Sequence, residues 1–218
     1  MSKTISLVRS ETTFMLPVVD LLAAYCAASK EETRYYLRGV FCEITTASEV
    51  IITATTGSVA FTRTIQADGA RIGELVATQS TDVSKGFILS IDIADKAFKA
   101  KARHELWAHG DIVTGLIQVI DFDPSDPWAD TGERVGVVEF EVIDGTFPDW
   151  RRIMPVEAES GDMMTVDANL LVTFQKIVRI YGHKSITLHP AKSGNPVKVS
   201  MSLVPGLTGV IMPMRRDV

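Results

Sequence analysis

The feature that most restricts the fold of this chain is a recurring order of secondary structure. One extended segment, one helix and two or three further extended segments follow each other three times, at intervals of about 70 residues. Sequence identity between the three rounds is slight, so only the pattern repeats. Helices are predicted at 16–28, 94–109 and 168–181. Strands are predicted at 35–45, 49–55, 58–65, 87–93, 112–120, 135–143, 163–167, 185–189, 196–203 and 207–212, and 66–86 is predicted to be a polar loop.

The first and third predicted helices each have one apolar face. That face carries Val18, Val19, Leu22 and Cys26 in the first helix, and Leu171, Phe174, Val178 and Tyr181 in the third. Strands with single helices on one side indicate an α+β fold, in which mostly antiparallel sheets form one layer and helices the other.

Composition and charge exclude several classes of protein. The chain has 218 residues, 46% of them apolar, and no run long enough to span a bilayer. The N-terminus lacks the apolar stretch of a secretory signal, so we expect a cytoplasmic protein. In a reducing compartment, Cys26 and Cys42 are expected to be small buried hydrophobic residues rather than a disulfide or a metal pair. The net charge of −5 argues against indiscriminate coating of nucleic acid, although it allows a basic patch on one surface.

Basic residues gather on the predicted helices, whereas acidic residues gather in loops, above all in the proline-containing segment 121–133. The basic residues are Lys96, Lys99 and Arg103 on one face of the second helix, Lys176 and Arg179 on the third helix, and Lys30 and Arg34 after the first. One such stripe is usually a solvated helix face. Two stripes in repeating units, with the acidic residues in loops, favour an electropositive surface for phosphates.

No arrangement of residues predicts an active site, so we expect a protein that is not an enzyme and has no catalytic residues. The four histidines have no metal-ligand partner at i+3 or i+4, and no phosphate-binding or nucleophile motif occurs. The spacing of carboxylates in 121–133 does not match a calcium loop. No metal and no cofactor is therefore expected.

The stretch 144–155, D-G-T-F-P-D-W-R-R-I-M-P, combines a turn with two aromatic residues and two arginines. Asp144–Gly145 starts a turn, and the prolines at 148 and 155 exclude a helix through the whole stretch. Turn formation does not require Trp150 or the two arginines. The stretch therefore either binds a ligand or holds packed units together.

Three stretches resemble the bacterial replicative DNA polymerase sliding clamp, the beta subunit of DNA polymerase III. "ETRYYLRGVFCEI" at 32–44 is similar to the clamp's middle domain, just after its first helix. "DGTFPDWRRIMP" resembles the end of that domain and the linker beyond it, and "GVIMPMRRDV" at 209–218 resembles the C-terminal strand and tail. The order of the three motifs also agrees, and the resemblance covers nearly the whole chain.

The resemblance implies about one and a half clamp domains. Residues 1–158 resemble the middle domain, with half-units of about 1–85 and 86–158, and 159–218 resemble the second half of the last domain; the first domain is missing. The acidic segment 121–133 resembles an insertion. The turn that usually reads A-T-D-G is Ala54–Gly57 without the aspartate, and Ala60 stands where a larger apolar residue is expected.

In the family, helices line the inside of a ring around duplex DNA, and the outside of the ring is acidic. A sliding ring must contact phosphates and not bases, so its binding should depend on salt. The resulting DNA-binding candidates are Arg34, Tyr35, Lys96, Lys99, Arg103, Lys176 and Arg179. For Tyr35 and its neighbour Tyr36, packing in the core or between subunits is the alternative.

The resemblance also implies a groove between the middle and last domains that binds linear peptides of polymerases, clamp loaders and repair proteins. The corresponding wall positions are Leu37, Thr55, Ala60, Pro148, Arg152, Ile153, Val210, Met212 and Met214. Methionine and valine offer an adaptable apolar pocket, and Arg152 can hold a polar peptide group. The alternative is that 148–155 only seals two packed units.

The function implied is a processivity factor that encircles duplex DNA without sequence specificity, as a homo-oligomer. A ring of four such chains would have as many half-units as a known clamp ring, so a tetramer is favoured. The alternative from another class is an adaptor or decoy that does not encircle DNA and competes for clamp-binding peptides. A third possibility is an interaction protein that has lost both functions.

Overall fold

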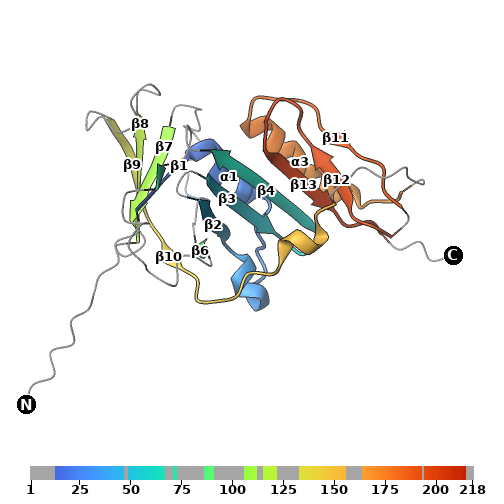
Figure 1. Cartoon of the computed structure of the whole chain (residues 1–218), viewed down its shortest axis with the longest axis horizontal. Coiled ribbons are helices and arrows are strands. Elements are labelled where there is room, and N and C mark those ends of the chain that lie inside the picture. The colour runs from blue at the N-terminus through green and yellow to red at the C-terminus, as the bar shows by residue number, and fades with distance from the viewer. Residues whose placement is uncertain are drawn as a thin grey trace, which may run out of the picture.

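A computed structural model of the chain describes residues 13–46, 49–66, 71–72, 86–90, 106–111, 115–121, 133–155, 164–192 and 194–214, which form two antiparallel sheets (Figure 1). The five-stranded sheet has the order β5 (Arg71–Ile72), β1 (Thr13–Pro17), β7 (Leu106–Asp111), β8 (Leu116–Asp121) and β9 (Glu133–Glu139). The eight-stranded sheet has the order β10 (Glu141–Val142), β6 (Phe87–Ser90), β2 (Val40–Thr46), β3 (Glu49–Thr55), β4 (Val59–Gln66), β13 (Leu207–Ile211), β12 (Val197–Ser200) and β11 (Thr187–Leu188).

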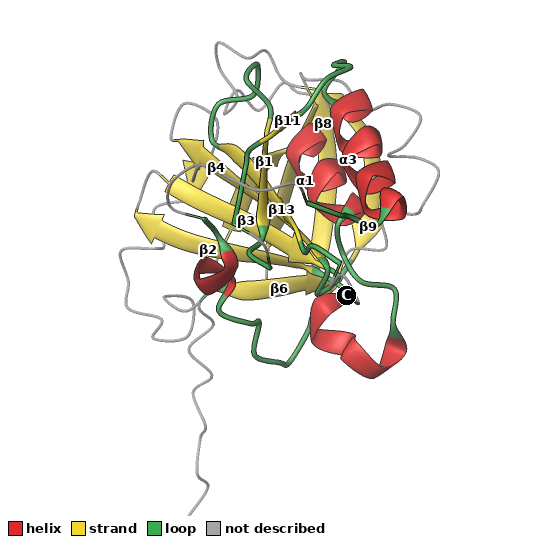
Figure 2. Cartoon of the chain, turned by 90° about the vertical axis from the view of Figure 1, so that its right-hand side faces the viewer, coloured by secondary structure: helices red, strands yellow, loops and turns green. Residues whose placement is uncertain are grey.

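The helix α1 (Val18–Cys26) is buried on nearly all sides. It begins directly after Pro17, which sits at the N-cap, where its missing N–H costs no hydrogen bond. Strands of both sheets contact α1, and the helix α3 (Ala168–Ile180) packs beside it (Figure 2). This position explains why Leu21, Ala23 and Ala24 are buried in addition to the predicted apolar face.

The helix α3 lies close against β13, which is an interior strand of the eight-stranded sheet. Its N-terminus is capped by the Asp167 carboxylate, which accepts a hydrogen bond of 2.8 Å from the Asn169 N–H. Phe174 is completely buried, and a Cβ at Gly209 on β13 would overlap its ring. Glycine at position 209 therefore sets how closely the helix approaches the sheet.

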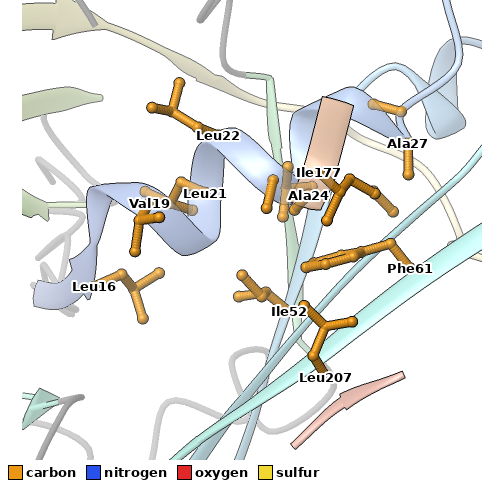
Figure 3. Close-up of a cluster of buried hydrophobic side chains, with 14 of the residues drawn as sticks. Leu16, Val19, Leu21, Leu22, Ala24, Ala27, Ile52, Phe61, Ile177 and Leu207 are labelled. Atoms are coloured by element: carbon orange, nitrogen blue, oxygen red, sulfur yellow. The ribbon is translucent and has the colours of Figure 1, made fainter. Parts of the chain in front are cut away.

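The main core lies between α1, α3 and the inner faces of both sheets (Figure 3). The figure labels Leu16, Val19, Leu21, Leu22, Ala24, Ala27, Ile52, Phe61, Ile177 and Leu207. A smaller cluster of Leu37, Ile88 and Phe147 lies apart from it. Successive side chains of a strand point to opposite faces of the sheet. Phe87 and Leu89 of β6 point into the main core, so Ile88 between them points the other way, and the small cluster lies on the outer face of the sheet.

A buried polar network joins α1, β4 and the end of α3. The Asp20 Oδ1 atom accepts hydrogen bonds from Arg63 Nε at 3.1 Å and from the Tyr181 hydroxyl at 2.5 Å. Asp20 is only 2% exposed. Burial, and next the Asp20 charge, raise the pKa of the Tyr181 phenol well above its usual range. The network connects residues from the first and third rounds of the sequence pattern.

Several sequence predictions need correction. The helix predicted at 94–109 is wrong at its end, because 106–111 form β7, where Leu106 and Ala108 are buried at the two-residue spacing of a strand; residues 94–105 lie outside the described part. No strand forms at 164–167, where the chain runs up to the α3 cap. Residues 16–17 end β1, and 35–37 belong to the 3₁₀ helix η1 (Glu32–Leu37). Arg71–Ile72, placed in the predicted polar loop, form the short strand β5.

Candidate functional site

Three of the predicted groove residues lie in one row across the eight-stranded sheet. Ala60 on β4 is the register partner of Thr55 on β3 and of Val210 on β13. Opposed residues of neighbouring strands project from the same face of a sheet. Val59 and Phe61, the neighbours of Ala60, belong to the core under α1, so the row faces away from α1. All three row residues are buried, which means that other side chains cover the row in this structure.

The turn between β3 and β4 is held by two threonine hydroxyls. Thr55 Oγ1 donates to the Val59 carbonyl at 2.7 Å and accepts from the Gly57 N–H at 2.9 Å. Thr56 Oγ1 accepts from the N–H groups of Ser58 and Val59, at 3.3 and 3.2 Å. Thr56 thus supplies the acceptor oxygen that an aspartate side chain offers in the A-T-D-G form of this turn. Gly57 has a φ of 91°, which favours glycine.

Arg34 lies beside the same turn. A Cβ at Gly57 would be 2.9 Å from Arg34 Nη1, so η1 and the β3–β4 turn are in contact. The Arg34 guanidinium also forms an ion pair of 3.3 Å with Glu31, and both side chains are at least half exposed. Tyr35 is 53% exposed and packs edge-on against Tyr36, with ring centroids 5.7 Å apart. Two DNA-binding candidates are therefore at the surface next to the candidate groove.

Leu37 and the stretch 147–150 meet on the outer face of the sheet. The Phe147 ring stacks on Phe41 of β2, with centroids 4.8 Å apart and planes 6° from parallel. Leu37 and Trp150 pack against the same cluster. The two aromatic residues of the D-G-T-F-P-D-W stretch therefore fill a small second core. Pro148, between them, is exposed.

The two arginines of the stretch differ in their surroundings. Both lie in the 3₁₀ helix η4 (Trp150–Ile153). Arg151 forms an ion pair of 2.8 Å with Glu43 on β2, and its guanidinium carbon is 4.4 Å from the centroid of the Trp150 ring. Arg152 is exposed and forms no ion pair with any residue that the structure describes. The Glu43–Arg151 pair was not predicted, and no signal in the sequence identifies it.

The C-terminal wall continues from β13 past the β3–β4 turn. The Met212 N–H donates to the Ser58 carbonyl at 2.9 Å, and the Met214 N–H donates to the Thr165 carbonyl at 2.9 Å. The Met212 side chain is half-buried and that of Met214 is 55% exposed. Together with Ile153, which is half-buried, and the exposed Pro148, these are the accessible apolar members of the predicted groove.

The remaining DNA-binding candidates separate into two groups. Lys176 and Arg179 are exposed on α3, on the side away from Phe174, Ile177 and Val178, which are buried. Lys96, Lys99 and Arg103 lie outside the described residues. The structure thus presents four of the seven candidates at the surface and does not describe the other three.

Within its described residues, the structure has no group of three or more His, Cys, Asp or Glu side chains that could hold a metal ion. In the same part of the chain, no helix has both the length and the apolar character needed to cross a membrane.

No protein-family model and no curated protein sequence matches this chain. Solved structures do match over almost its entire length. The Helicobacter pylori beta clamp bound to a DNA ligase peptide superposes with a TM-score of 0.64 at 12% identity, covering 98% of this chain and 68% of the clamp. The Pseudomonas aeruginosa DNA polymerase sliding clamp with ligand gives 0.60 at 12% identity, covering 99% and 69%. The Bartonella birtlesii clamp bound to griselimycin gives 0.60 at 13% identity, covering 99% and 68%.

These matches confirm the resemblance at the level of the fold and confirm the α+β class predicted from the sequence pattern. They extend over both sheets and both helices, because only 1–2% of the chain is left outside them. The chain therefore has the fold of the bacterial DNA polymerase III beta sliding clamp, over a length that corresponds to about two thirds of a clamp subunit.

Proposed function

We propose that the chain is a sliding-clamp-like processivity factor, which encircles duplex DNA as a homo-oligomer and binds short linear peptides of replication or repair proteins. The observation that carries this proposal is the clamp fold extending over 98–99% of the chain. The protein would act by holding other proteins on DNA and would carry out no reaction itself.

We further propose that residues 1–158 correspond to a complete middle domain and 159–218 to half of the last domain. The pairing of β4 with β13 is consistent with this proposal, because it places one strand of each proposed part side by side in one sheet. The packing of α1 against α3 supports it on the inner face. The Asp20–Arg63–Tyr181 network adds a polar connection across the same boundary.

The DNA contacts in this proposal come from exposed basic residues of η1 and α3. Lys176 and Arg179 project from the solvent side of α3, and Arg34 is at least half exposed beside the β3–β4 turn. Contacts to phosphates make affinity fall with salt and leave it independent of base sequence. We expect Lys176→Gln and Arg179→Gln to weaken duplex binding equally for unrelated sequences and to reduce the salt dependence by about one ion each.

The homo-oligomer is supported by the edges of the two sheets. Among the described strands, β9 ends the five-stranded sheet and β11 ends the eight-stranded sheet, and both carry exposed apolar residues. Val137 on β9 is 46% exposed and Leu188 on β11 is 44% exposed. Unpaired edges of this kind are ready partners for another strand. We propose that β9 of one copy pairs with β11 of the next, closing a tetramer.

Light scattering coupled to size exclusion tests the ring. We expect a tetramer that Val137→Lys or Leu188→Lys converts to smaller species, because a lysine at the edge opposes strand pairing. Val172→Lys is the matched control, since Val172 is 42% exposed on α3, away from both edges. A strict monomer for the unchanged protein at micromolar concentration would rule out the ring.

Retention on DNA separates the two functional alternatives. A closed ring should stay on nicked circular DNA and slide off after the circle is linearised. Peptide binding without any retention on the circle would instead favour the adaptor or decoy that does not encircle DNA. Loss of both activities in a folded protein would leave only an interaction protein.

The peptide groove is tested at its C-terminal wall. We expect Met212→Glu and Met214→Glu each to reduce binding of a DNA ligase peptide by about 30-fold, or ~2 kcal/mol, because the charge replaces an apolar contact. A peptide of this type is bound by the Helicobacter pylori clamp. Leu203→Glu is the control, since Leu203 is 70% exposed and outside the predicted walls. Equal effects of all three substitutions on fluorescence polarisation would contradict the groove.

A further inference from the structure

A cavity of about 510 Å³ lies beside η1. Its wall is built by the end of α1 and the residues after it, by η1, and by Ser90 at the end of β6. None of the predicted groove residues lines the cavity, and of the predicted DNA-binding residues that the structure describes only Tyr35 does. The proposed function therefore leaves this cavity unexplained.

Two charged residues among those that the structure describes line the cavity, and both are cations. Lys30 and Arg38 line it, both are exposed, and no described residue that lines the cavity is acidic. Glu31, the carboxylate next to Lys30 in the sequence, is paired with Arg34 instead. Neither Lys30 nor Arg38 forms an ion pair within the described part of the chain. Two uncompensated cations at one opening attract an anion, and a guanidinium favours phosphate or carboxylate oxygens.

Hydroxyl groups complete the polar wall. Ser29 is only 6% exposed, and its Oγ accepts a hydrogen bond of 3.1 Å from the Glu31 N–H, so its own proton remains to be donated to a ligand. Ser90 also lines the cavity. A buried hydroxyl beside two cations is a donor set suited to phosphate oxygens.

The size and the aromatic content of the cavity restrict the ligand further. The volume is within the range of about 300–1,000 Å³ that is typical of small-molecule sites, and it is much larger than a single inorganic anion requires. The rings of Tyr25 and Tyr35 and the side chain of Ala28 add an aromatic and apolar surface. A ligand with a phosphate at one end and a flat ring at the other matches both parts. We propose that this cavity binds a free nucleotide, with Lys30, Arg38 and Ser29 holding the phosphate and a tyrosine ring packing on the base.

Isothermal titration calorimetry of the full chain with ATP, AMP, adenosine and inorganic phosphate tests this site. We expect ATP and AMP to bind more tightly than adenosine or phosphate alone. Lys30→Gln and Arg38→Gln should each weaken nucleotide binding by about tenfold or more, since each removes a charge-assisted hydrogen bond. Both residues are exposed, so the variants should fold, which circular dichroism verifies. Lys176→Gln, with the same loss of charge on α3, should leave nucleotide affinity unchanged.

The remaining outcomes would overturn the assignment. Absence of nucleotide binding up to about 1 mM, or binding that Lys30→Gln and Arg38→Gln do not change, would remove the site. Adenosine binding as tightly as AMP would show that the cations do not hold a phosphate. A single-stranded oligonucleotide that displaces ATP although its concentration, counted in nucleotides, is far below that of ATP would show that the occupant is a nucleic acid strand. Because Lys30 and Arg38 are not among the ring or groove residues, failure here is separate from failure of the clamp proposal.

Discussion

Replacing Tyr181 by phenylalanine removes one hydrogen bond from the buried network that joins α1 to α3. The Tyr181 hydroxyl donates to Asp20 Oδ1 over 2.5 Å, and Asp20 is 2% exposed. A hydrogen bond to a charged group contributes about 1.5–3 kcal/mol. Arg63 Nε still donates to the same carboxylate at 3.1 Å, so the Asp20 charge does not become unpaired. We therefore expect Tyr181→Phe to lower the free energy of unfolding by about 2 kcal/mol near neutral pH.

The effect of this substitution should depend on pH in a defined direction. Burial, and next the Asp20 charge, raise the pKa of Tyr181 in the folded protein, whereas a tyrosine in the unfolded chain ionises near pH ~10. Above that pH the unfolded state has lost a proton that the folded state keeps, so the unchanged protein loses stability as pH rises, by up to about 1.4 kcal/mol per pH unit. Tyr181→Phe lacks this loss. The stability difference between the two proteins should therefore shrink above about pH 10.

Urea unfolding followed by circular dichroism, at one fixed protein concentration, measures both effects between about pH 7 and about pH 11. Tyr35→Phe is the control, because Tyr35 is 53% exposed and its loss of a hydroxyl should change stability by less than about 0.5 kcal/mol. A Tyr181→Phe protein as stable as the unchanged one near neutral pH would refute the energetic role of the network. A difference that stays constant into the alkaline range would refute the raised pKa.

Three further predictions concern packing and burial. Gly209→Ala should lower the free energy of unfolding by about 1–3 kcal/mol, because the new Cβ overlaps the Phe174 ring. Adding Phe174→Leu should relieve part of that loss in the double variant. If urea unfolding shows that the losses of the two single variants simply add up in the double variant, the contact is contradicted. Phe147→Ala should cost about 3 kcal/mol by removing a buried ring of the second core, and a loss below about 1 kcal/mol would show that the stretch does not stabilise the fold. Burial raises the pKa of the Cys42 thiol, which is the one thiol left in a Cys26→Ala protein. This variant should therefore resist labelling by a thiol reagent until urea unfolds it. Rapid labelling of the native variant would contradict the burial of Cys42.

Local pattern located the elements that have a clear periodicity and clear boundary residues of their own. The predicted strand 49–55 coincides with β3, and the helix predicted at 168–181 differs from α3 by one residue at its end. Both have a clear periodicity and clear boundary residues, including the Asp167 cap. The strand β7 was missed because it is held between β1, which is distant in the sequence, and its neighbour β8, and these pairings, not local propensity, decide its conformation.

The candidate site depends even more on distant pairing. Thr55, Ala60 and Val210 form a row only because β4 and β13 pair in one register, and the sequence suggests that row only through its resemblance to clamps. The choice between the adjacent arginines of η4 could not be predicted, since only the position of Glu43 on β2 distinguishes Arg151 from Arg152. The cavity beside η1 was also not predicted, because its wall combines segments separated by long stretches of chain.

The β4–β13 pair has a consequence for synthesis of the protein on the ribosome. Strand β13 consists of residues 207–211, so it is synthesised long after β4 (Val59–Gln66). Until then β4 has an open edge on that side, and Phe61 on it lacks its neighbours from the C-terminal part. The pairing of β4 with β13 consequently forms late in the folding of the nascent chain. Nascent chains must avoid aggregation through that open edge until β13 has been made.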